Sequence, residues 1–170
     1  MNRIKSLLLC CALCLVFNSV KSQTVNSKSY DIMLKTLLSR NVPELSIENA
    51  VLETKAIFID ARSLEEYEVS HIKDAKHVGF KNPDFSSLDT IEKSSQIIVY
   101  CSVGYRSEKI TQQLIKIGYT DIYNLYGGIF EWKNQGHEIV NHENKPTENV
   151  HAYNLVWGVW LNKGIKVYSK

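Results

Sequence analysis

The stretch Gln96-Ile-Ile-Val-Tyr-Cys-Ser-Val-Gly-Tyr-Arg-Ser107 decides the fold. Its first five residues are almost all apolar and predict a buried β-strand. Apolar residues at helical spacing follow the stretch and predict a helix over residues 107–117. Ser107 is expected to cap the start of this helix, and Gly118 is expected to end it. A strand that passes through a short turn into a helix is typical of a parallel α/β sheet.

Short strands and helices also alternate on both sides of this stretch. Further strands are expected at residues 56–59, 76–78 and 121–125, and further helices at residues 30–40, 64–69, 84–91 and 127–134. Apolar strands that alternate with helices imply a sheet covered on both faces. The predicted fold class is therefore α/β, with three layers and a central, mostly parallel sheet flanked by helices.

The N-terminal residues 1–22 have the pattern of a secretory signal peptide. Arg3 and Lys5 form a basic start, and the eleven apolar residues that follow from position 7 are too few to span a bilayer as a mature helix. Val20 and Ser22 place small residues before a cleavage site. These features favour export, to the periplasm or the extracellular space, over the alternative of a buried N-terminal helix.

Length and composition describe an ordinary globular protein. The 170 residues are 44% apolar and 22% charged, which favours one domain with a core that needs no disulfide. The formal net charge of +2 is too small to suggest nucleic acid as the main partner. Cleavage after residue 22 would remove three basic residues and no acidic one. That leaves 17 basic against 18 acidic residues, a net charge of −1.

The cysteine count points to one residue. Three of the four cysteines lie in the signal peptide, which leaves Cys101 as the only one in the mature chain. A lone thiol forms no internal disulfide and is open to oxidation in an oxidising compartment. A lipid anchor on a leader cysteine is disfavoured, because Leu13 precedes Cys14 where a small residue is expected. Cys101 is then either an inert core residue or a functional thiol.

The neighbours of Cys101 favour a functional thiol. Cys101 and Asp60 each follow an apolar strand, and the carboxyl ends of parallel strands meet at one edge of the sheet. The five residues after Cys101 must turn tightly, which Gly104 permits. Backbone amides that converge in such a turn, together with the start of a helix, stabilise a thiolate or bind an anion. Arg106 adds a positive charge.

Three motifs resemble those of single-domain rhodaneses, here of an exported bacterial type. They are Asp60-Ala-Arg-Ser-Leu-Glu-Glu-Tyr67 with His71-Ile72 and Ala75, then Cys101-Ser-Val-Gly-Tyr-Arg-Ser107, then Leu125-Tyr-Gly-Gly-Ile-Phe-Glu-Trp132. The motifs follow one another in the order and spacing of that family. The resemblance divides the chain into a signal peptide (1–22), an N-terminal segment with a short helix (23–41), a rhodanese-like domain (42–140) and a C-terminal extension (141–170).

The resemblance implies sulfur transfer through a persulfide on a cysteine. Cys101 is then the nucleophile, which takes sulfane sulfur from a donor such as thiosulfate and passes it to a thiophilic acceptor. The residues assigned to substrate binding are Ser102, Val103, Gly104, Tyr105 and Arg106, and those assigned a supporting role are Asp60, Arg62 and Ser107. Neither a cofactor nor a metal is implied. The expected partners are small-molecule or protein-bound sulfur donors and acceptors, and a monomer is compatible with the sequence.

Three alternatives to an enzyme of this kind stay open. The first is a carrier that holds a persulfide or an anion in the same loop without turnover. The second is an inactive structural domain, which the intact Cys101, Gly104 and Arg106 argue against. Phosphatases of the same fold carry Cys-x5-Arg, whereas this chain has Cys-x4-Arg, a loop shorter by about 3.5 Å. The single basic residue of the loop also leaves open an uncharged or protein-bound donor.

Several other residues are expected to be structural. Glu66 is interpreted as an exposed or ion-paired helix residue, and His71 as a structural histidine. The pair Gly127-Gly128 is expected to permit close packing, and Trp132 to lie in the core. The aromatic C-terminal extension is expected to pack on the domain as a strap, with a lid or a partner surface near the site as the alternative.

Overall fold

The computed structural model describes residues 25–168. The signal peptide predicted for residues 1–22 lies outside the described residues. The helices are α1 (Lys28–Leu37), α2 (Ile47–Ala50), α3 (Leu64–Val69), the 3₁₀-helix η1 (Ser86–Leu88), α4 (Tyr105–Lys116), α5 (Gly128–Asn134) and α6 (Leu155–Gly158). The strands are β1 (Glu44–Leu45), β2 (Ile57–Asp60), β3 (Lys76–His77), β4 (Ile97–Tyr100), β5 (Ile122–Leu125), β6 (Asn149–His151) and β7 (Ile165–Val167). Between residues 25 and 168 no helix is both long and apolar enough to cross a bilayer.

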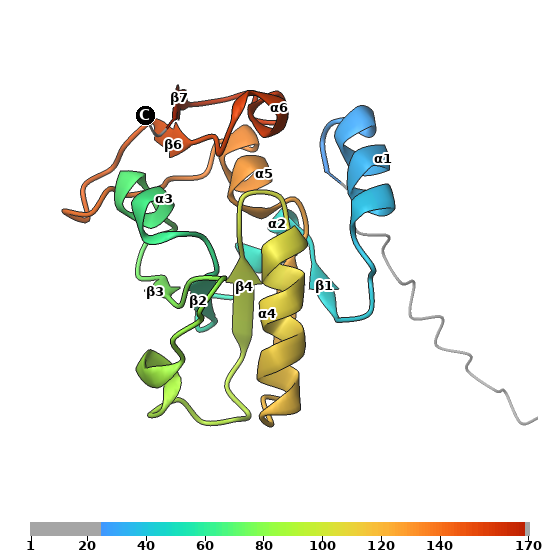
Figure 1. The fold of residues 1–170 in the computed structure, drawn as a ribbon, viewed down its shortest axis with the longest axis vertical. Coiled ribbons are helices and arrows are strands. Elements are labelled where there is room, and N and C mark those ends of the chain that lie inside the picture. Colours follow the sequence, from blue (N-terminus) through green and yellow to red (C-terminus); the bar gives the residue numbers. More distant parts are fainter. Residues whose placement is uncertain (1–24, 169–170) are drawn as a thin grey trace, which may run out of the picture.

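The central sheet has five parallel strands in the order β1-β5-β4-β2-β3 (Figure 1). The strand β4 lies in the middle, and Tyr100 at its end pairs with Asp60 at the end of β2. Asp60 and Cys101 therefore come to the same edge of the sheet, as the two apolar runs predict. The prediction of an α/β fold with a parallel sheet is confirmed.

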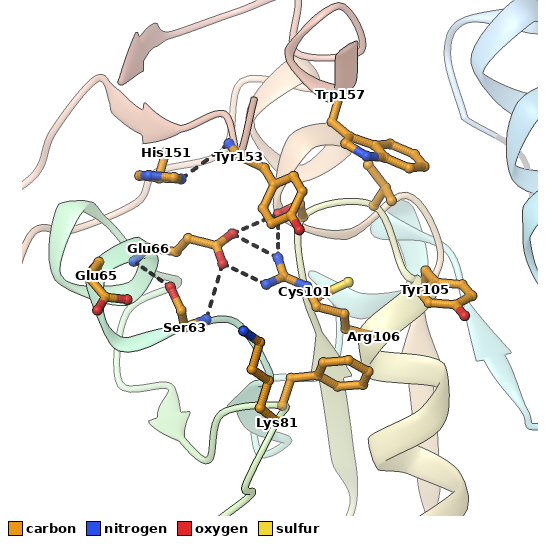
Figure 2. A pocket seen from close by; sticks show the side chains of 13 residues that line it. Ser63, Glu65, Glu66, Lys81, Cys101, Tyr105, Arg106, His151, Tyr153 and Trp157 are labelled. Atoms are coloured by element: carbon orange, nitrogen blue, oxygen red, sulfur yellow. Dashed lines mark hydrogen bonds and ion pairs between the residues drawn. The ribbon is translucent and has the colours of Figure 1, made fainter. Parts of the chain in front are cut away.

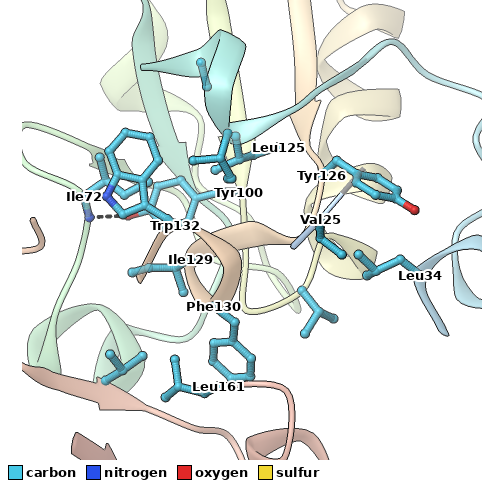
Figure 3. Close-up of a cluster of buried hydrophobic side chains, with 14 of the residues drawn as sticks. Val25, Leu34, Ile72, Tyr100, Leu125, Tyr126, Ile129, Phe130, Trp132 and Leu161 are labelled. Carbon is cyan, nitrogen blue, oxygen red and sulfur yellow. Dashed lines mark hydrogen bonds between the residues drawn. The ribbon is translucent and has the colours of Figure 1, made fainter. Parts of the chain in front are cut away.

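The strand β4 separates two layers of apolar side chains. Ile98 and Tyr100 belong to a large cluster that includes Ile129 and Phe130 of α5 (Figure 3). The alternate residues of β4, together with Cys101, belong to a second cluster on the side of α4. Successive side chains of a strand point to opposite faces, so the position of Cys101 after β4 directs its side chain toward α4.

The helices expected at residues 84–91 and 30–40 differ from the observed ones. The helix predicted at residues 84–91 is only the single 3₁₀ turn η1, and the prediction is wrong there. The Asp84 side chain accepts the amide of Ser86 at 2.9 Å, and residues of this kind compete with helix formation by bonding the backbone. The helix predicted at residues 30–40 is shifted toward the N-terminus, with Ser27 as its cap.

The C-terminal extension packs on the domain. The strands β6 and β7 form a small parallel pair, and β6 lies against α3. Val150, Ala152 and Leu161 are fully buried in the main core cluster. The ring of Trp160 stacks on Tyr30 of α1 with ring centres 5.3 Å apart. These contacts fix the extension in place over the edge of the sheet where Cys101 lies.

Candidate active site

Cys101 lies between the end of β4 and the start of α4. Its sulfur accepts a hydrogen bond from the amide of Gly104 at 3.2 Å, and Gly104 has φ of +113°, a conformation that favours glycine. Only 1% of Cys101 is exposed, yet it lines a pocket of about 730 Å³ (Figure 2). The twelve-residue helix α4 starts next to the sulfur and directs the positive end of its dipole toward it. This arrangement stabilises negative charge on the sulfur.

The cap of α4 differs from the sequence prediction. The helix starts at Tyr105 with Gly104 as its N-cap, so Ser107 is not the capping residue. The buried Ser107 hydroxyl instead donates to the Asn124 side chain at 2.7 Å, and Asn124 donates to the carbonyl of Gly104 at 3.1 Å. Ser107 therefore supports the loop through a residue of β5, because it lies on the helix face that is turned toward the sheet.

The start of α5 holds the backbone of the cysteine loop. The amide of Ile129 donates to the carbonyl of Cys101 at 2.9 Å, and the amide of Phe130 donates to that of Ser102 at 3.1 Å. A Cβ atom at Gly128 would lie 2.4 Å from the Cys101 carbonyl oxygen. The close packing expected of Gly127-Gly128 is thus the contact between α5 and the loop.

Arg106 pairs with Glu66 of α3. Its guanidinium makes two hydrogen bonds to the Glu66 carboxylate, at 2.6 and 2.8 Å, and one to the Ser102 hydroxyl at 2.9 Å. Burial alone would raise the pKa of Glu66, but the hydrogen bonds and charge of Arg106 outweigh it and lower this pKa to about 2. Glu66 is therefore ionised and buried. Its negative charge balances the positive charge of Arg106, which was predicted from the sequence to bind an anion.

Glu66 is expected to make folding stability depend on pH in the acid range. Its pKa is depressed from 4.5 to about 2. The stabilisation that ionised Glu66 gives the fold is therefore complete above its ordinary pKa. It is lost as the pH falls toward and through the pKa of Glu66 in the folded protein. When the pH falls from about 7 to about 3, the free energy of unfolding, measured with urea, is expected to drop in both proteins. We expect the drop to be about 2 kcal/mol smaller in the Glu66→Gln variant than in the wild type. An equal loss in the two proteins would contradict the role of this ion pair.

Asp60 and Arg62 form a buried ion pair beside the loop. Arg62 Nη2 lies 2.6 Å from Asp60 Oδ2 and donates to the carbonyl of Ser70 at 2.5 Å, with both side chains fully buried. The pair fixes the turn between β2 and α3, the helix that carries Glu66. Neither residue lines the pocket. Their position fits a supporting role.

Of the remaining predicted residues, Val103 and Tyr105 line the pocket, whereas His71 and Trp132 do not. Val103 is 5% exposed and belongs to the main core cluster, while Tyr105 is 42% exposed at the pocket rim. His71 stacks on Tyr67 with ring centres 3.9 Å apart and bonds its carbonyl, which is a structural arrangement. Trp132 lies in the core. Between residues 25 and 168 no three His, Cys, Asp or Glu side chains gather as metal ligands.

One side of the pocket comes from the C-terminal extension, for which a place near the site was expected only as the alternative to a strap. His151, Tyr153 and Trp157 of the C-terminal extension line it opposite α4 (Figure 2). The Tyr153 ring lies 5.2 Å from the guanidinium carbon of Arg106. The aromatic composition of the extension was the available signal. The extension is both a packed strap and a wall of the site.

The chain is similar to known proteins over this same region. A family model for the rhodanese-like domain matches residues 46–135. A thiosulfate sulfurtransferase of Coxiella burnetii is 28% identical over 98 residues, which cover 57% of this chain and 90% of that protein. A tRNA uridine(34) hydroxylase of Erwinia tasmaniensis is 33% identical over 96 residues, 53% of this chain and 27% of that protein. This chain thus matches about a quarter of the hydroxylase.

Solved structures show the same fold. A thiosulfate sulfurtransferase from Pseudomonas aeruginosa superposes with a TM-score of 0.55 at 23% identity, covering 69% of this chain and 23% of that one. The rhodanese-like domain of an Anabaena protein superposes with a TM-score of 0.53 at 23% identity, covering 58% of this chain and 79% of that one. With the three motifs, the fold and the matched residues together, the chain belongs to the rhodanese-like domain family.

Proposed function

We propose that this protein is a sulfurtransferase that carries a sulfane sulfur atom on Cys101. The observation that carries the proposal is the placement of the Cys101 sulfur. It accepts the Gly104 amide at the start of α4 and faces a pocket. An inert core cysteine has no need of an amide donor or of access to a pocket. Similarity to a named thiosulfate sulfurtransferase over 98 residues supports the same chemistry.

The reaction has two balanced steps. The Cys101 thiolate attacks the outer sulfur of thiosulfate, an S–S bond forms, and the donor's own S–S bond breaks as sulfite leaves with the electron pair. Cyanide or a thiolate then attacks the terminal sulfur, and the electron pair of the persulfide bond returns to Cys101. The Gly104 amide and the dipole of α4 stabilise the negative charge in both resting forms. We also propose that the reaction takes place after export, because residues 1–22 have the sequence pattern of a signal peptide.

The proposal predicts steady thiocyanate formation from thiosulfate and cyanide. Because the enzyme alternates between a free and a sulfur-loaded form, we expect ping-pong kinetics, with parallel lines in double-reciprocal plots at several cyanide concentrations. Intersecting lines would contradict a persulfide intermediate. A protein that takes up one sulfur atom but releases none to cyanide or small thiols would instead be a carrier that delivers sulfur to a partner protein.

A further inference from the structure

One wall of the pocket comes from outside the family domain. The family match ends at residue 135, whereas Tyr153 and Trp157 belong to the C-terminal extension. This wall is held in place by the core, since Val150 and Ala152 on either side of His151 are fully buried. The Asn154 side chain caps α6 by accepting the amide of Trp157 at 3.0 Å. The backbone that carries the two aromatic side chains therefore has a defined position beside the pocket that Cys101 also lines.

The charged groups of the pocket balance one another. Glu65 and Glu66 oppose Lys81 and Arg106 among the lining residues, and burial lowers the pKa of His151, which keeps it neutral near pH 7. Arg106 is the only basic residue of the cysteine loop, and its guanidinium pairs with Glu66 at 2.6 Å. An inorganic dianion such as thiosulfate therefore meets little net attraction on entering.

Four aromatic side chains contribute to the lining of the pocket. Phe80, Tyr105, Tyr153 and Trp157 all line the pocket (Figure 2). Its volume of about 730 Å³ lies in the range of pockets that bind organic ligands. Thiosulfate contains only five non-hydrogen atoms and leaves most of this volume unused. The pocket has room, and a suitable surface, for an organic group attached to the sulfur that Cys101 attacks.

We propose that the aromatic wall of the C-terminal extension makes this site selective for organic sulfane-sulfur compounds with an apolar, preferably aromatic, substituent. The selectivity rests on the sulfur transfer proposed above, because it concerns the donor of that same reaction. Tyr153 and Trp157 are the residues that determine the specificity. Their rings contact the substituent, while Gly104 and α4 stabilise the sulfur.

Two donors that differ only in their substituent test the selectivity. Benzenethiosulfonate and methanethiosulfonate are both monoanions with the same reacting sulfur. In each case the Cys101 thiolate forms an S–S bond to the outer sulfur, and a sulfinate leaves with the electron pair of the broken S–S bond. We expect kcat/KM for the benzene compound to exceed that for the methane compound by about tenfold or more. A ratio near one in the wild type would overturn the proposal.

Variants of the aromatic side chains locate the selectivity. Tyr153→Ala and Trp157→Ala are expected to reduce the ratio severalfold. Leu155→Ala, a matched control on α6 at a residue that is 75% exposed and outside the pocket lining, is expected to keep the ratio. Tyr105→Ala tests the rim without altering the extension. An unchanged ratio in both Tyr153→Ala and Trp157→Ala, or a ratio that falls only in Tyr105→Ala, would overturn the proposal. If the protein takes up no sulfur from thiosulfate, benzenethiosulfonate or methanethiosulfonate, the proposed function itself is overturned.

Discussion

The Cys101→Ser variant is expected to lose sulfur transfer while it keeps its fold. A serine hydroxyl has nearly the same shape as the thiol, but it is not ionised near neutral pH and forms no persulfide. Cys101 is the only cysteine among the described residues, so no second thiol there can take over. We expect thiocyanate formation to fall by at least about a thousandfold.

The same variant also provides its own control for folding. Because Cys101 is 1% exposed and the substitution changes one atom, we expect the thermal unfolding midpoint to stay within a few degrees of the wild type. A folded variant with more than about a hundredth of the wild-type rate would show that another group carries the sulfur.

The Gly128→Ala variant is expected to damage both the fold and the activity. The added methyl group would lie 2.4 Å from the Cys101 carbonyl oxygen and 2.7 Å from that of Ser102, and the φ of Gly128 is +57°. The added methyl group would be attached to the backbone of α5 and would meet the backbone of the cysteine loop, so one of these two segments has to move. We expect a loss of about 3 kcal/mol in the free energy of unfolding by urea. A displaced sulfur is expected to lower the transfer rate by about a hundredfold.

The Gly118→Ala variant is the matched control. Gly118 also has a positive φ, +101°, but no atom lies within 4 Å of its added Cβ, at the far end of α4. It is expected to cost about 1 kcal/mol of stability and to leave the transfer rate unchanged. Equal stability losses in the two variants, with full activity in both, would show that α5 does not position the loop.

Local patterns were sufficient to predict the elements that bring Cys101 to its place. The apolar run before Cys101 predicts β4, and the residues that form α3 match the predicted range of 64–69. Gly118 ends α4 in a left-handed conformation, as its position predicts. These features depend on residues close in sequence, so a single sequence contains enough information for them.

The electrostatics of the site depend on contacts between distant residues. Arg106 and Glu66 lie 40 positions apart, and their pairing follows only once α3 is placed beside the cysteine loop. From the sequence alone, the Arg106 guanidinium is therefore predicted to be available for an anion, whereas in the structure Glu66 neutralises it. The start of α4 was misplaced for a similar reason. Ser107 suits a cap by residue type, but Asn124 of β5 takes its hydroxyl.

The aromatic wall had the least support in the sequence. A segment of 30 residues with several aromatic side chains is compatible with a strap, a lid or a partner surface. Its place over the site follows from the burial of Val150 and Ala152 and from the packing of β6 on α3. No short-range pattern contains this information.

The mass of the intact protein after incubation with a sulfur donor tests the central claim most directly. We predict a gain of one sulfur atom, located on Cys101 by peptide mapping, after treatment with thiosulfate or benzenethiosulfonate. Cyanide is then expected to remove it and restore the original mass. An unchanged mass with every donor, under conditions in which the thiol is shown to be reduced, would contradict the assignment of Cys101 as a sulfur carrier.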